Sequence, residues 1–234
     1  MRDFFSLDGA FNRYGSYVAD IVILSLMWII FSIPIITAGA ATSALFYVTT
    51  RRIAGREGYI TSDFWEGFKS SFKRATILWL IILVLVLLAI FNLFNLDLVG
   101  GMVNLILPAQ VILLAQIALI SVFLFPATAR FDMGVVQTVK SCFYMANRHL
   151  LTSLTCVLLM VVLIAASIFV HGLITFLIPG IYAMLSSYLI MRIFKRYRPE
   201  MDKDPILEIQ EIEAQKAEER RKRDISTMED ANEE

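Results

Sequence analysis

The residues that most often carry chemistry are few in this chain and widely spaced. Its histidines are His149 and His171, and its cysteines are Cys142 and Cys156. Neither histidine has an acidic residue or a cysteine nearby at the spacing that metal ligands show. There is no glycine-rich phosphate loop and no pairing of a nucleophile with a base, so the sequence predicts no catalytic, cofactor-binding or metal-binding residue. The cysteines are predicted to be small buried hydrophobic residues.

Four side-chain amides interrupt otherwise apolar sequence: Asn92, Asn95, Gln110 and Gln116. Such amides can hydrogen-bond a neutral solute such as a sugar, or they can join helices to one another inside a membrane. Both interpretations stay open. Asp20 and Asp97 fall at the ends of predicted spans and no ionisable residue lies deep in one, which argues against a proton-coupled transporter or pump.

Long runs without a charged residue dominate the chain. Residues 21–50, 75–96, 98–129 and 149–191 contain no Asp, Glu, Lys or Arg. Hydrophobic residues make up 58% and charged residues 18% of the chain, with a mean hydropathy of +0.69. A membrane-spanning helix needs about 20 predominantly apolar residues. The sequence therefore predicts an all-α polytopic transmembrane helical bundle that contacts the lipid bilayer, and it excludes disordered, fibrous and ordinary cytosolic proteins.

The predicted spans are 18–33, 37–53, 75–96, 106–128, 151–171 and 174–192. The run 21–50 is long for one span and short for two. Because Pro34 breaks the helical pattern and Thr37 can cap a new helix, a tight hairpin and six spans are favoured. One long kinked helix would give five. The small residues from Gly39 onward allow close helix packing in lipid, so Pro34, Thr37 and Gly39 are predicted to be structural.

Basic residues set the predicted orientation, because they collect in cytoplasmic loops. The segments 51–74 and 129–150 and the stretch after the last span carry basic residues, whereas the loops near 97–105 and 171–173 carry none. The former segments and the C-terminus are therefore predicted to be cytoplasmic. Six spans place the N-terminus inside, and five place it outside.

Both cytoplasmic segments have an amphipathic helical pattern. In 63–75, phenylalanines recur at i, i+4 and i+8, lysines lie beside them, and Asp63 is the expected cap. In 132–150, Val135, Val139 and Phe143 repeat this spacing and Asp132 is the expected cap. Four identities at an offset of 71 suggest a parallel pseudo-repeat.

These two segments are predicted either to lie flat on the inner leaflet, with basic residues facing anionic headgroups, or to be docking helices for a cytoplasmic partner. The residues predicted to contact a partner are Phe64, Trp65, Phe68, Lys69, Phe72, Lys73, Val139, Lys140 and Phe143.

A charged tail follows the membrane domain. Residues 1–198 are the predicted membrane domain and 199–234 the cytoplasmic tail. The net charge of zero conceals a split, since residues 1–194 carry 12 basic and 8 acidic side chains and residues 195–234 carry 9 and 13. Asp204 and Pro205 are predicted to begin a charged helix. No basic domain points to nucleic acid.

One run resembles the signature of the YesL-like family: Ile33-Pro34-Ile-Ile-Thr37-Ala-Gly39-Ala-Ala-Thr42-Ser-Ala44-Leu-Phe-Tyr47. Further similar features are Arg56-Glu57-Gly58-Tyr59, Asp63-Phe64, Phe68 to Ala75, Phe131-Asp132 and the ending Arg192 to Tyr197. The resemblance covers about residues 1–198 and leaves the tail outside. The family consists of bacterial membrane proteins without an established activity, so it supplies no catalytic residues.

The resemblance implies residence in the cytoplasmic membrane of a bacterium, mostly Gram-positive. It also implies a link to carbohydrate uptake, because such proteins are typically encoded beside sugar ABC importers. We therefore expect an accessory component that contacts the permease or ATPase of an importer. The alternative is a stand-alone transporter or channel for a neutral solute such as a saccharide. Nothing in the sequence supports a membrane enzyme or specifies a homo-oligomer.

Overall fold

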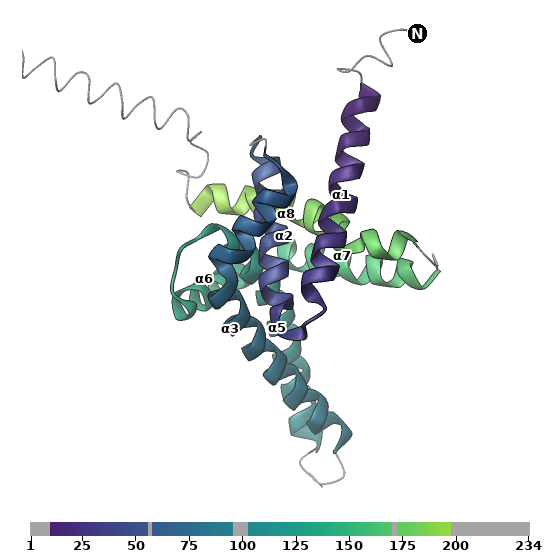
Figure 1. Ribbon diagram of the computed structural model, residues 1–234. Helices are drawn as coiled ribbons and strands as arrows, with labels where there is room; N and C mark the ends of the chain where they lie inside the picture. The colour runs from purple at the N-terminus through teal and green to yellow at the C-terminus, as the bar shows by residue number, and fades with distance from the viewer. Residues whose placement is uncertain (1–9, 56–57, 96–102, 170–172, 198–234) are drawn as a thin grey trace, which may run out of the picture. The chain divides into compact units, whose positions relative to one another are not determined.

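The computed structural model describes residues 10–55, 58–95, 103–169 and 173–197, which form helices joined by short connections (Figure 1). The helices are α1 (Ala10–Ser32), η1 (Ile35–Thr37), α2 (Ala38–Ile53), α3 (Ile60–Phe94), α5 (Val103–Arg130), α6 (Val135–Arg148), α7 (Leu150–Phe169), η3 (Leu173–Leu177) and α8 (Ile178–Tyr197). The charged helix predicted from Asp204 lies outside the described residues, as do Asp97 and His171.

Four of the described helices are long and apolar enough to cross a membrane. Their spanning stretches are Ile60–Phe94, Ile106–Arg130, Leu150–Ile168 and Thr175–Phe194. Val18–Ser32 of α1 is a shorter apolar helix. The predicted count of six spans is not confirmed. The predicted span 37–53 corresponds to α2, which is rich in small and hydroxyl side chains and carries Arg51 and Arg52 in its last turn.

The chain breaks at Pro34, as the sequence predicts. α1 ends at Ser32, and α2 begins at Ala38 after the short η1 helix. Thr37 occupies the residue before α2, but its hydroxyl does not cap that helix. It donates instead to the backbone carbonyls of Phe31 at 2.7 Å and Pro34 at 2.9 Å. Thr37 therefore stabilises the turn on its α1 side, which corrects the predicted cap.

α2 runs antiparallel to the N-terminal half of α3. A Cβ atom on Gly39 would lie against Trp79 and 2.7 Å from the carbonyl oxygen of Ala75. Near the other end of α2, Arg51 lies 3.6 Å from Asp63. Because α2 ends opposite the start of α3, the apolar C-terminal half of α3 continues past the first residue of α2.

The first predicted amphipathic segment, 63–75, is not a separate helix. It is the beginning of α3, which runs unbroken for 35 residues and measures about 52 Å at 1.5 Å per residue. The surface-lying alternative would therefore require a bend in α3 between this segment and the apolar stretch that follows it. Asp63 lies in the first turn of α3, and Tyr59 takes the cap position.

The second predicted segment does form its own helix, α6. Gly134 rather than Asp132 precedes its first residue, Val135. The two segments, which look alike in the sequence, therefore differ in structure: one extends a long helix, and the other stands between two helices.

Candidate docking surface and its supporting polar cluster

Two of the predicted contact residues belong to the core. Phe64 has no exposed surface and Phe68 is 9% exposed. Both pack against Phe31 of α1, with ring centroids 5.5 and 5.0 Å away. Phe64 and Phe68 therefore cannot serve as free anchors for a partner, because α1 already covers them.

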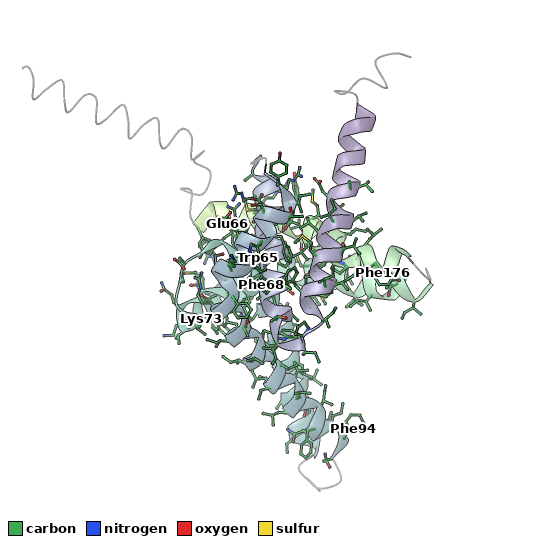
Figure 2. All side chains as sticks on the ribbon, in the orientation of Figure 1. Trp65, Glu66, Phe68, Lys73, Phe94 and Phe176 are labelled. Carbon is green, nitrogen blue, oxygen red and sulfur yellow. The ribbon has the colours of Figure 1, made fainter. Side chains whose placement is uncertain are left out.

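Their neighbours on α3 remain accessible. Trp65 is 44% and Phe72 is 38% exposed, and Lys69 and Lys73 are exposed beside them. Figure 2 shows Trp65 and Lys73 on the helix that carries the buried Phe68. We call Trp65, Lys69, Phe72 and Lys73 the aromatic–basic strip.

The strip is held by contacts within α3 and with α1, since the Trp65 ring centroid lies 5.8 Å from that of Phe31. Trp65 stacks on Phe68 with a centroid separation of 5.9 Å, and Phe72 lies 5.3 Å from the same ring. The Lys69 ammonium is 4.8 Å from the centre of the Trp65 ring, a cation–π contact worth about 0.5–1 kcal/mol at an exposed site. The buried Phe68 ring thus packs against both exposed rings.

The acidic residues near the strip form ion pairs with Arg51 of α2. Nη1 of Arg51 lies 3.6 Å from an oxygen of Asp63 and 3.5 Å from an oxygen of Glu66, and it donates to the Tyr47 hydroxyl at 3.0 Å. Arg51 therefore offsets one of these two negative charges, and Lys69 and Lys73 leave the strip and its surroundings with a net positive charge.

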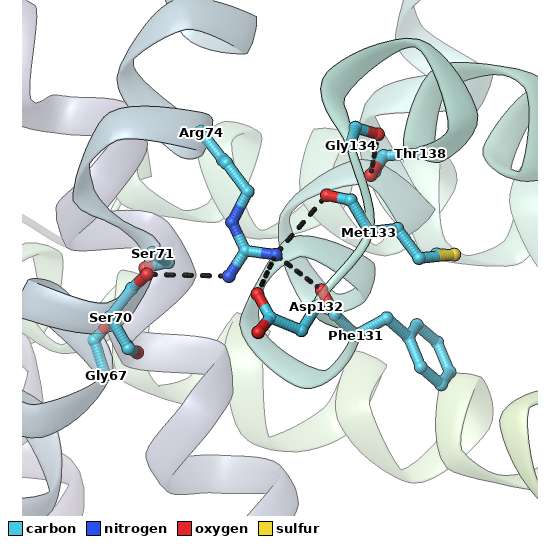
Figure 3. Close-up of polar contacts among 9 residues, drawn as sticks. All are labelled: Gly67, Ser70, Ser71, Arg74, Phe131, Asp132, Met133, Gly134 and Thr138. Carbon is cyan, nitrogen blue, oxygen red and sulfur yellow. Dashed lines mark hydrogen bonds and ion pairs between the residues drawn. The ribbon is translucent and has the colours of Figure 1, made fainter.

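Arg74 fastens α3 to the connection between α5 and α6 (Figure 3). Its Nη1 donates to the backbone carbonyls of Phe131 at 2.9 Å and Met133 at 3.3 Å, and it lies 2.7 Å from the Asp132 carboxylate. Its Nη2 donates to the Ser70 carbonyl at 3.4 Å. One guanidinium thus positions the start of α6 relative to α3.

Asp132 contributes less to this fastening than the two carbonyls. Its side chain is 98% exposed, against 23% for Arg74, and an exposed ion pair contributes at most about 1 kcal/mol. The predicted role of Asp132 as a helix cap is wrong, because its carboxylate faces Arg74.

We expect Arg74→Ala to destabilise the protein by about 1–3 kcal/mol, because two backbone carbonyls lose a charged donor. Asp132→Asn should cost less than about 1 kcal/mol. Thermal unfolding of the detergent-purified variants measures both changes. Equal effects of the two substitutions would contradict the importance given to the carbonyl contacts.

The predicted contact residues of α6 lie on its exposed side. Val139 is 37% and Phe143 is 51% exposed, and Lys140 is exposed between them. The opposite side of α6 is buried and comprises Thr138, Cys142, Met145 and Ala146.

The four amides do not converge on one place. Gln110 donates to the Ala89 carbonyl and so joins α5 to α3, while Asn95 donates to the Phe91 carbonyl of its own helix at 2.8 Å. Asn92 is exposed. The Nε2 atom of Gln116 is buried and has no hydrogen-bond acceptor among the described residues. Among the four, Gln116 is therefore the amide whose buried nitrogen lacks a described acceptor.

Sequence reasoning missed Phe31, Arg51 and Arg74 as organising residues. Arg130 is a fourth, since it donates to the Thr50 carbonyl at 3.0 Å and joins α5 to α2. All three arginines lie in the basic segments from which the membrane orientation was predicted. Their clustering there was the feature of the sequence that could have identified them. The part of the chain that the structure describes holds no group of three metal-ligating side chains, and both cysteines are free and buried.

These features define an α-helical integral membrane protein with an exposed aromatic–basic strip at the start of a long apolar helix. Residues 21–93 match the model of a family described as a protein of unknown function, DUF624. The matched region contains α1 from residue 21 onward, all of α2, the strip and Arg74. This family match is consistent with the YesL-like resemblance. Searches of curated proteins and of solved structures gave no match.

Proposed function

We propose that this membrane protein is an accessory component of a carbohydrate ABC importer, and that the aromatic–basic strip contacts the permease or ATPase of that importer. The docking part rests on one observation: Trp65 and Phe72 are exposed on a helix that continues without a break into an apolar, membrane-length stretch. The carbohydrate part rests on the YesL-like resemblance.

The strip has the composition of an interface centre. Tryptophan is enriched among the residues that contribute most to protein association. The stacking of Trp65 on Phe68 and the position of Lys69 over the Trp65 ring restrict the strip before any partner arrives. Such preorganisation lowers the entropy lost on binding. Lys69 and Lys73 favour a partner surface with acidic residues.

The unbroken α3 gives docking a mechanical consequence. A partner bound at Trp65 holds one end of a helix whose other end carries Leu87, Phe91 and Phe94, all exposed apolar side chains. A rigid helix transmits a tilt at one end to the other. An accessory protein built in this way reports importer movement to the membrane, or restrains that movement.

The test is purification of the tagged protein from its native membrane in mild detergent, with and without Trp65→Ala and Phe72→Ala together. We expect stoichiometric sugar permease or ATPase subunits with the parent protein and at least about a tenfold loss with the double variant, since each lost anchor contributes on the order of 1–2 kcal/mol. Phe94→Ala, at the far end of the same helix, is the matched control and should retain the partner.

Two results contradict the proposal. One is a folded double variant that keeps its importer subunits. The other is a parent protein that purifies alone and moves neutral saccharides across liposomes, which would support the stand-alone transporter. The buried amide of Gln116, in the middle of α5, is the observation that favours this second candidate.

A further inference from the structure

The two ends of α6 are both tied to membrane-length helices. α5 ends at Arg130, residues 131–134 connect it to α6, and only His149 separates α6 from α7. The spanning stretches of these neighbours are Ile106–Arg130 and Leu150–Ile168, so they reach both of these connections. A helix tethered at each end to a span cannot move far from the membrane surface.

The exposed side of α6 carries apolar and aromatic side chains beside the polar Gln137 and Asn147, whereas a water-facing helix would be polar throughout. Val136 is 67%, Phe143 51% and Tyr144 54% exposed, and Val139 joins them on this side. The opposite side of α6 packs on the rest of the protein through Cys142 and Ala146. The exposed residues therefore do not contribute to the protein's own core. This pattern is typical of helices that lie in the plane of a membrane interface.

The charges on this side have one sign. Lys140 and Arg148 are exposed, and the sequence has no Asp or Glu between Asp132 and Glu200. Asp132 is itself paired with Arg74. Arg148 donates to the Tyr144 hydroxyl at 3.2 Å, which holds the guanidinium beside an aromatic ring. Basic and aromatic groups in this arrangement complement phosphate headgroups above acyl chains.

We propose that α6 is a binding surface for acidic phospholipids. Val136, Val139 and Phe143 enter the acyl boundary, while Lys140 and Arg148 pair with headgroup phosphates. α6 thereby differs from the aromatic–basic strip of α3. The strip lies on an extension of a span and is suited to a protein partner, whereas α6 is fixed along the bilayer and is suited to lipid.

The experiment places an environment-sensitive bimane label at Val139→Cys of the full-length protein in nanodiscs. The discs contain either brominated phosphatidylglycerol or brominated phosphatidylcholine at the same mole fraction. The native thiols compete poorly for the label, because Cys142 and Cys156 are buried and burial raises the pKa of Cys142 to about 12. Ser62→Cys, at an exposed residue in the first turn of α3 and farther from the Arg74 cluster, is the matched control position.

We expect the label at residue 139 to be quenched by both lipids and about twofold more by the acidic one, because basic side chains enrich anionic lipid around them. The label at residue 62 should be quenched by neither. Lys140→Gln together with Arg148→Gln should abolish the difference between the lipids and leave the quenching by phosphatidylcholine in place.

The proposal is overturned if the label at residue 139 is unquenched, or if both lipids quench it equally in the protein with Lys140 and Arg148 intact. That second comparison needs no charge variant, so it stands even where the double variant fails to fold. No importer is present in the discs, and the result is therefore independent of the proposed docking on α3.

Discussion

Phe64→Ala is expected to destabilise the protein by about 3–5 kcal/mol, the usual cost of removing a fully buried phenylalanine ring. Phe64 has no exposed surface, and its ring packs between Phe31 of α1 and Phe68 of the next helical turn. Truncation leaves a cavity at the contact that joins the α1–α2 hairpin to α3. A loss of this size is a large fraction of the stability of a typical domain.

The neighbouring substitution Trp65→Ala should cost about 1–2 kcal/mol in stability, less than Phe64→Ala, because this side chain is 44% exposed but contacts Phe31 and Phe68. Thermal unfolding in detergent, followed by size-exclusion chromatography of the surviving protein, compares the two variants. Phe94→Ala, at an 83% exposed residue, is the control for loss of an exposed ring. Equal destabilisation by Phe64→Ala and Trp65→Ala would show that α1 does not cover this face of α3.

The phenylalanine spacing predicted the helix but not the surroundings of its apolar face. Phe64, Phe68 and Phe72 do lie on one helix, at the spacing of one face. Two of them are buried because Phe31, far away in the sequence, packs on them. In a membrane protein an apolar face can meet lipid, a partner or another helix, and periodicity is the same in all three cases.

Arg74 precedes the predicted span 75–96, but α3 does not begin there. Charge marks where an apolar stretch ends, whereas a helix ends where its backbone hydrogen bonds end. No proline lies between Ile60 and Phe94, and the only glycine is Gly67. Gly67 allows close packing of α3 on α2, since a Cβ atom there would lie 2.8 Å from Tyr47. The absence of a stop signal was available in the sequence and predicts one continuous helix.

The polar cluster around Arg74 was harder to foresee. Two of its acceptors are the backbone carbonyls of Phe131 and Met133, and every residue type offers a carbonyl. Sequence can place a basic residue at the end of a span. It cannot say which turn of another segment comes within 3 Å of that residue, so the link between α3 and α6 emerges only from the fold.

The small size of Gly39, at the start of α2, was enough to predict that this residue has a structural role. Gly39 also supports the second large prediction. Gly39→Val is expected to destabilise the protein by about 3 kcal/mol, near the upper end for overpacking. The new side chain would meet the Trp79 side chain and the Ala75 carbonyl, which is backbone and cannot move aside. α2 would have to separate from α3, and the contact between Arg51 and Asp63 would lengthen with it.

The matched control is Gly134→Ser, at the residue before α6. No atom lies within 4 Å of a Cβ built there, and serine is favoured at the start of a helix, so the change should stay within about 0.5 kcal/mol. Thermal unfolding of both variants in the same detergent gives the comparison. If Gly39→Val unfolds at the temperature of the parent protein, α2 and α3 do not pack as closely as Gly39 requires. The antiparallel register that places Arg51 beside Asp63 would then be wrong as well.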